Sequence, residues 1–230
     1  MHELSKKIII ATHHPMVGIG MSSRKARGKV KTKTWYNTYA FDIFPGQWIG
    51  ETLASDPEGL IGRNVEVVVR DITGDFMHEK YKLWFKIFKV EGNKAYARFV
   101  KEMLNKDYMR SIIQRRSSRV DIQSEGVTKD GNYVRIFTLI ITLTRIRSSQ
   151  KHAIREKVDE YVRSMIPNYT VEEIVRSFIF GNPLPVTSEI QRISSKIAPI
   201  KYVELRKMVI LKPSEREAEE RIESSAASGG

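Results

Sequence analysis

The sequence predicts an α+β fold, with a mostly antiparallel sheet or partly open barrel in the N-terminal two-thirds and helices packed against it in the C-terminal third. Three observations carry this prediction. Alternating apolar and polar residues recur between residues 35 and 146, which is the period of a half-buried strand. Clusters of Gly, Pro, Asn and Asp separate these segments as turns do. Residues 152–197 instead repeat apolar side chains at helical spacing.

The first predicted strands lie between residue 35 and about residue 100. Alternation predicts a strand over 64–72. The stretch 81–90 has apolar side chains on both faces, so we expect it to be buried on both sides. Glu91-Gly92-Asn93 then joins it to residues 94–100 as a hairpin.

A short helix and a second hairpin follow. Asn105 is a suitable cap for a helix over 106–116, with Met109, Ile112 and Ile113 facing inward. Lys129-Asp130-Gly131 then joins strands over 118–128 and 132–146, because an Asp-Gly turn between β-rich segments is a strong hairpin signal.

The last third is predicted to be mainly helical. A first helix covers 152–166 and stops at Pro167. Thr170 and Glu173 form a capping box for a second helix that ends at Gly181. A third helix over 187–197 and a strand over 202–211 complete a single globular domain of residues 35–212. We expect a basic arm at 21–34 before this domain and a flexible acidic tail at 213–230 after it.

The composition indicates a protein that meets a polyanion. The chain has 39 Lys and Arg against 27 Asp and Glu, a net charge of +12, and no cysteine. The lack of cysteine excludes disulfides and thiolate chemistry and fits a reducing, cytoplasmic compartment. The longest apolar run, residues 136–143, is far shorter than the ~18 residues of a membrane-spanning helix. A basic domain of this kind most often binds nucleic acid, so we expect no membrane partner.

The first candidate RNA contact is the basic arm. Six of its ten residues from 24 to 33 are basic and none is acidic: Arg24, Lys25, Arg27, Lys29, Lys31 and Lys33. Such a slim segment can follow a groove and neutralise several phosphates, or it can be a solvated tail. Trp35 follows directly and is a candidate for stacking on bases, although an aromatic residue at a strand start more often belongs to the core.

Two further basic clusters lie at junctions between elements. One comprises Arg115, Arg116 and Arg119, where guanidinium groups would bind phosphate and the hydroxyls of Ser117-Ser118 would add donors. Cations at this place could instead stabilise a helix C-terminus. The other comprises Arg145, Arg147, Lys151 and Arg155, with Ser148-Ser149 as a helix cap, and its alternative is a solvated surface.

No catalytic or metal site is evident in the sequence. The five histidines, at positions 2, 13, 14, 78 and 152, lack the spacing of metal ligands. No nucleophile has a base at a recognisable spacing. We therefore expect neither enzymatic activity nor a cofactor.

Short motifs in a fixed order resemble those of the archaeal and eukaryotic small-subunit ribosomal protein S1e family. They are Lys33-Thr34-Trp35-Tyr36, Ile49-Gly50-Glu51-Thr52, Gly62-Arg63-Asn64-Val65-Glu66, Thr73-Gly74-Asp75, Arg115-Arg116-Ser117-Ser118, Thr128-Lys129-Asp130-Gly131, Gln150-Lys151 with Ile154-Arg155, and Arg206-Lys207 through Leu211-Lys212-Pro213. Ala198-Pro199 departs from the Tyr-Pro that is more usual in the family.

This resemblance implies a structural constituent of the small ribosomal subunit, on the platform near the messenger RNA exit. The implied partners are small-subunit ribosomal RNA and neighbouring ribosomal proteins, with messenger RNA and initiation factors as further candidates. The residues alone leave a second hypothesis open, namely a free-standing RNA-binding protein or RNA chaperone.

Residues 1–20 share neither the charge of the arm nor the periodicity of the core, and the resemblance does not reach them. We expect them to be unstructured, or to lie upstream of a translation start at Met21. The alternative is a genuine extension in which Ile8-Ile9-Ile10 adds a strand to a sheet edge.

Overall fold

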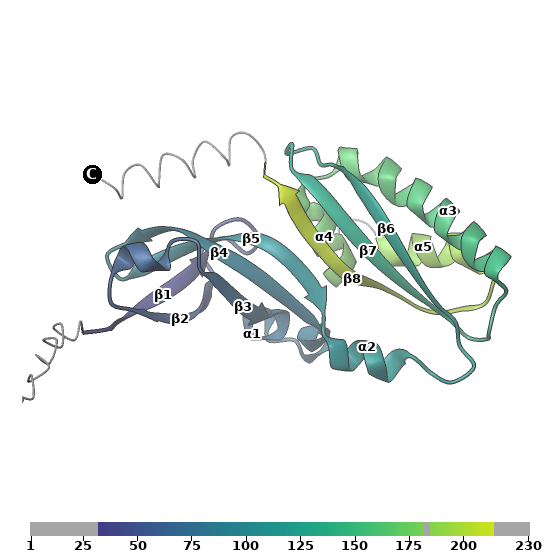
Figure 1. The fold of residues 1–230 in the computed structure, drawn as a ribbon, viewed down its shortest axis with the longest axis horizontal. Helices are drawn as coiled ribbons and strands as arrows, with labels where there is room; N and C mark the ends of the chain where they lie inside the picture. Colours follow the sequence, from purple (N-terminus) through teal and green to yellow (C-terminus); the bar gives the residue numbers. More distant parts are fainter. Residues whose placement is uncertain (1–31, 182–184, 214–230) are drawn as a thin grey trace, which may run out of the picture. The chain divides into compact units, whose positions relative to one another are not determined.

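The computed structural model describes residues 32–181 and 185–213. The chain divides into two units between Thr32 and Lys33, and the described residues belong almost entirely to the second. The expectations for residues 1–20, for the arm up to Lys31 and for the tail after Pro213 lie outside these residues. Within the described part, eight strands form one open, mostly antiparallel sheet with the helices mainly later in the chain, which confirms the predicted fold class (Figure 1).

Five strands make the N-terminal part of the sheet: β1 (Thr34–Ala40), β2 (Trp48–Ala54), β3 (Asn64–Val68), β4 (Tyr81–Glu91) and β5 (Lys94–Leu104). β4 and β5 form the predicted hairpin, with Glu91 opposite Lys94. β1 pairs antiparallel with β2 and parallel with the first residues of β5. The inward side chains of these strands, including Leu83 and Phe85, are fully buried and form the core of this part.

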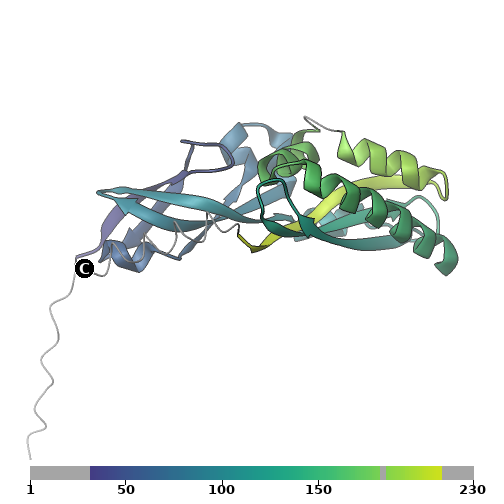
Figure 2. The same cartoon turned by 90° about the horizontal axis from the view of Figure 1, so that it is seen from above.

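The second hairpin and the last strand continue the sheet in the order β5-β8-β7-β6, with β6 (Arg119–Val127), β7 (Tyr133–Thr142) and β8 (Ile200–Lys212). β8 lies between β5 and β7 and so joins the two parts of the sheet. Three helices pack on β6–β8: α3 (Ser148–Met165) against β6, and α4 (Val171–Phe180) and α5 (Val186–Ser195) against β8 (Figures 1 and 2).

α4 begins and ends at the residues that carry capping signals, Thr170 and Gly181. The backbone N–H of Glu173 donates to the Thr170 hydroxyl (3.2 Å), and the Glu173 carboxylate accepts from the Thr170 N–H (2.9 Å). Gly181 closes α4 with a φ of 71°, a left-handed conformation that glycine adopts at little cost. Short 3₁₀ turns cover Pro57–Leu60, Phe76–Lys80 and Ile166–Asn168.

Two strand predictions are wrong in detail. The strand expected over 64–72 ends at Val68, and α1 (Val69–Thr73) follows. Gly74 closes this helical turn in a left-handed conformation, and its N–H donates to the Arg70 carbonyl (2.7 Å). β4 is buried on one face only, because Trp84 and Phe88 on its other face are half-buried.

Two helix boundaries also differ from the prediction. α2 (Lys106–Ile112) stops four residues early, and Ile113 is exposed rather than inward. α3 begins at Ser148, earlier than the predicted start at residue 152. The early end of α2 places Arg115 and Arg116 in the connection between α2 and β6, whereas the early start of α3 places Lys151 inside the helix. Among the described residues, no helix is long and apolar enough to cross a membrane.

Candidate nucleic-acid interface

Two connections that are distant in the sequence lie side by side, the α2–β6 connection (residues 113–118) and the β7–α3 connection (residues 143–147). Ser118 and Thr142 hold them together. The backbone N–H of Ser118 donates to the Thr142 hydroxyl (2.9 Å), and the Thr142 N–H donates to the Ser118 carbonyl (3.0 Å). The Ser118 hydroxyl accepts a further bond from the N–H of Ile146 (3.1 Å). Ser118 thus fixes both connections.

The paired connections form a basic groove of about 1000 Å³. Its lining is Arg115, Arg116, Ser117, Ser118, Arg119, Leu143, Thr144, Arg145 and Lys151. The groove therefore brings together Arg115, Arg116 and Arg119 of the second basic cluster and Arg145 and Lys151 of the third. No carboxylate lines it. We call this surface the basic groove.

Most cations of the basic groove are free to bind an external anion. Arg115, Arg116 and Arg145 are exposed, and their side chains form no ion pair or hydrogen bond with any other described residue. Arg116 has a φ of 65°, an uncommon conformation for a residue with a Cβ atom. The neighbouring Ser117 stabilises this turn, since its N–H (3.3 Å) and its hydroxyl (2.6 Å) both donate to the Gln114 carbonyl.

The serines do not have the role that we expected of them. The Ser117 hydroxyl donates to the Gln114 carbonyl, and Ser118 is 4% exposed, with its hydroxyl accepting from the Ile146 N–H. Neither hydroxyl is therefore presented to a phosphate. Ser148 and Ser149 do not cap α3 either. The N-cap is Arg147, whose backbone N–H donates to the Gln150 side chain (3.1 Å).

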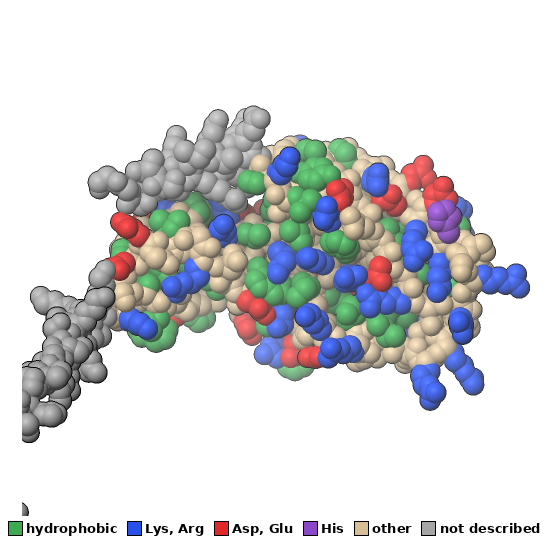
Figure 3. Space-filling model, viewed as in Figure 1, with side chains coloured by type: hydrophobic (Ala, Val, Ile, Leu, Met, Phe, Trp, Pro, Cys, Tyr) green, Lys and Arg blue, Asp and Glu red, His purple; other side chains and the backbone are tan. Residues whose placement is uncertain are grey.

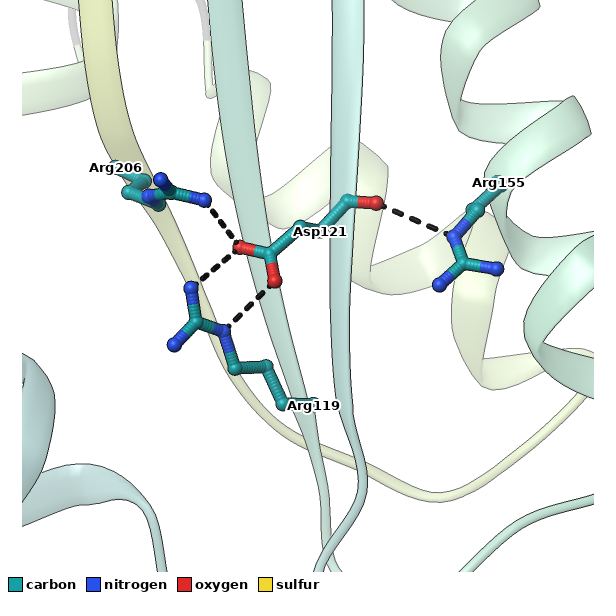
Figure 4. A network of polar contacts seen from close by, with 4 residues as sticks. All are labelled: Arg119, Asp121, Arg155 and Arg206. Atoms are coloured by element: carbon teal, nitrogen blue, oxygen red, sulfur yellow. Dashed lines mark hydrogen bonds and ion pairs between the residues drawn. The ribbon is translucent and has the colours of Figure 1, made fainter.

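Arg119 takes part in a network centred on Asp121 of β6 (Figure 4). Its guanidinium donates to both carboxylate oxygens (2.8 and 2.9 Å), and Arg206 of β8 donates to one of them (2.9 Å). Partial burial alone would raise the pKa of the Asp121 carboxyl, but the hydrogen bonds and charges of Arg119 and Arg206 outweigh it and lower that pKa. Asp121 therefore stays ionised and restrains two arginines.

Of the remaining predicted residues, those that the structure describes lie around this groove or at the start of β1. Arg155 of α3 is exposed, and its Nε donates to the Asp121 backbone carbonyl (3.2 Å; Figure 4). Arg147 is exposed at the start of α3, and Lys33 is exposed just before β1. Trp35 is 62% exposed, whereas Tyr36 is 6% exposed, so the first aromatic residue faces outward and the second belongs to the core.

Arg206 and Lys207 of β8 are two further basic residues of this part of the sheet, and our site prediction left them out. Both lie within cation–π distance of the Phe137 ring, at 5.6 and 5.7 Å from its centroid. They are 85 or more residues from Asp121 in sequence, so only the pairing of β8 with β7 brings them to this surface. Figure 3 shows Lys and Arg side chains gathered over the part of the molecule that carries β6, β7 and α3. Among the described residues, no group of His, Cys, Asp or Glu is arranged to hold a metal ion.

Comparison with known proteins gives the family. The model of the Ribosomal S3Ae family matches residues 21–214 of the chain. The chain belongs to this family. The small ribosomal subunit protein eS1 of Staphylothermus marinus is 40% identical over 185 residues, which cover 80% of this chain and 86% of that protein. The eS1 proteins of Methanocaldococcus jannaschii (36% over 197 residues, 86% and 87%) and Saccharolobus islandicus (36% over 204 residues, 89% and 96%) are similar over a comparable length.

Membership of the Ribosomal S3Ae family confirms the resemblance drawn from the short motifs. The members of this family are structural ribosomal proteins, which also confirms the prediction that the chain is not an enzyme. Of the predicted interface residues, Arg115, Arg116, Arg119, Arg145 and Lys151 line the basic groove. Lys33 and Trp35 lie apart from its lining, on the N-terminal part of the sheet.

Proposed function

We propose that this chain is a structural constituent of the small ribosomal subunit and binds small-subunit ribosomal RNA through the basic groove, with the arm at 24–33 as a second RNA contact. The free cations of the groove carry this proposal. Arg115, Arg116 and Arg145 come from two connections and line one concave surface without a carboxylate. Guanidinium groups bind phosphate through two parallel hydrogen bonds, so such a surface suits the RNA backbone.

Family membership supports the ribosome as the place of this binding. The curated relatives are named as proteins of the small ribosomal subunit. The motif resemblance implies a position on the platform near the messenger RNA exit, with neighbouring ribosomal proteins as further partners. The charge of the chain agrees with an RNA partner, because 39 basic residues stand against 27 acidic ones.

The test is a charge reversal at the free cations of the groove. The variant Arg115→Glu/Arg116→Glu/Arg145→Glu is compared with the control Lys86→Glu/Lys106→Glu/Lys196→Glu. The control removes the same charge at exposed lysines that do not line the groove and have no described partner. Each phosphate contact contributes about 0.7–0.9 to the slope of log K against log salt, so the groove variant should lose a slope of about 2.

Two measurements decide the outcome. We expect the groove variant to be lost from small subunits during a high-salt wash while the control co-sediments, and both to melt close to the wild type. Unchanged co-sedimentation and an unchanged salt slope of the groove variant would contradict the proposal. If both variants bind ribosomal RNA normally but neither is found in small subunits, the protein acts as a free-standing RNA-binding protein.

A further inference from the structure

A row of aromatic side chains lies on the outer face of the N-terminal strands, apart from the basic groove. Trp35 and Tyr39 alternate with the buried Tyr36, Thr38 and Ala40 along β1, so both point away from the core. Trp48 of β2 lies opposite Tyr39, and Tyr96 of β5 lies opposite it on the other side. We call these four side chains the aromatic row.

The two tryptophans of the aromatic row are more exposed than a core or a simple strand face requires. Trp35 is 62% exposed and Trp48 is 53% exposed. Tyr39 lies four positions after Trp35 along the strand, so the row extends for about 13 Å. Tyr39 and Tyr96 are half-buried, and their ring centroids are 6.5 Å apart, so these two rings pack against each other.

A β-bulge places Trp48 in this row. The pairing of Thr38 with Gly50 and of Tyr39 with Trp48 skips Ile49, which is 8% exposed and packs inside. Without the bulge, Tyr39 would face Ile49, and the alternation would turn Trp48 toward the core. The bulge therefore exposes the Trp48 indole and interrupts the regular pairing of β1 with β2.

The charges around the aromatic row favour an anionic partner. Lys33 precedes Trp35 by two residues and is exposed, and the Lys94 ammonium lies 5.8 Å from the Tyr39 ring centroid. Two acidic residues lie on the same face. Glu91 forms an ion pair with Lys89 (2.7 Å). Glu51 lies opposite Asn37 and forms no ion pair with a described residue.

We propose that the aromatic row binds unpaired bases of single-stranded RNA by stacking. The proposal rests on the proposed function only in that the partner is RNA, since the row and the basic groove share no residue. Strand faces that carry exposed aromatics and flanking cations bind single strands in this way, because every base has a π face and the backbone is anionic. Exposed aromatic side chains also occur at protein interfaces, and here the flanking cations Lys33 and Lys94 favour the anionic RNA backbone as the partner.

Intrinsic fluorescence gives a direct test, because the chain has three tryptophans and two of them belong to the row. The third, Trp84, is half-buried beneath the Lys101 ammonium, 3.9 Å from its ring. The full-length protein is titrated with an oligouridylate of about 12 nucleotides and with an RNA duplex of about 16 base pairs. The variants are Trp35→Ala/Trp48→Ala, Trp35→Phe/Trp48→Phe and the control Trp84→Phe.

We expect the oligouridylate, but not the duplex, to quench the fluorescence of the wild type and of Trp84→Phe. The double variants lack both tryptophans of the row, so their affinities are measured from the anisotropy of a fluorophore-labelled oligouridylate. The double alanine variant should bind the oligouridylate at least about fivefold more weakly, and the double phenylalanine variant should retain most of the affinity. Equal affinity of the wild type and the double alanine variant would overturn the proposal, as would an equal loss in Trp84→Phe. If the double alanine variant binds RNA normally but loses a neighbouring ribosomal protein, the row is a protein contact and the proposal is wrong.

The same titration separates this proposal from the preceding one. The groove variant Arg115→Glu/Arg116→Glu/Arg145→Glu should still show quenching by the oligouridylate, because none of its changes lies in the aromatic row. If that variant also binds ribosomal RNA normally, the basic-groove proposal fails while the aromatic-row proposal stands.

Discussion

Replacement of Asp121 by Asn should weaken the fold and strengthen RNA binding at the same time. Asp121 accepts three hydrogen bonds from Arg119 and Arg206, and the side chains involved are 33–37% exposed (Figure 4). Ion pairs with this exposure contribute little, about 0.5 kcal/mol each. The loss of two pairs should lower the free energy of unfolding by about 1 kcal/mol, which corresponds to a Tm decrease of about 2–4 °C in a chain of this size.

The pH dependence of this effect follows from the lowered pKa of Asp121. Its stabilising contribution is fully present above the ordinary aspartate pKa of about 3.9 and is lost as the pH falls through the lower folded-state value. The difference in Tm between Asp121→Asn and the wild type should therefore be constant near neutral pH. It should shrink in acid, where Asp121 of the wild type becomes protonated.

The RNA effect has the opposite sign. Asp121→Asn frees two guanidinium groups beside the basic groove, so the slope of log K against log salt should become steeper by up to about 1.4. The control is Glu66→Gln, which removes an equal charge from the Lys82 pair (2.8 Å) on β3 and β4. A variant with unchanged Tm and an unchanged slope would refute this reasoning. So would a variant that binds RNA more weakly than the wild type.

Three further predictions concern stability. Gly126→Ala should lower the free energy of unfolding by about 1–3 kcal/mol, because the new Cβ would lie 3.0 Å from the buried Ile166 side chain; denaturant titration would contradict this if no loss were found. Burial and then the charge of Glu204 raise the pKa of the fully buried Glu102, so stability is lost as the pH rises above the ordinary glutamate range. The free energy of unfolding of Glu102→Gln should therefore rise relative to that of the wild type as the pH is raised from acidic to alkaline values. A difference between the two proteins that does not change with pH would contradict this. Thr170→Ala should cost about 1 kcal/mol through loss of the capping box, measured as a Tm decrease that Thr170→Ser largely avoids.

The basic groove shows how far the sequence leads toward a site. Charge and residue type were sufficient to predict its cations and their tendency to bind phosphate. The sequence did not predict that these cations lie in one groove, because this depends on the hydrogen bonds between Ser118 and Thr142, which are 24 residues apart. Serines next to arginines suggested phosphate donors, whereas the fold uses these hydroxyls to fix the backbone of the two connections.

Local signals determined the hairpins, the helix caps at Asn105 and Thr170, and the fold class. The β4–β5 and β6–β7 turns, the Asn105 cap and the Thr170 capping box each depend on residues within four positions of one another. Such interactions form wherever the chain folds, so periodicity and turn residues are sufficient to predict them. The basic composition likewise indicated the class of partner without any knowledge of the fold.

Only the tertiary structure decided what depends on distant pairing. The insertion of β8 between β5 and β7 brings Arg206 to Asp121, and the bulge at Ile49 turns Trp48 outward. A strand carries no local signal for a neighbour that is distant in the sequence, because pairing hydrogen bonds are made by the backbone and are the same for every residue. The choice of neighbour depends on which buried faces fit together, and that is a property of the folded chain as a whole.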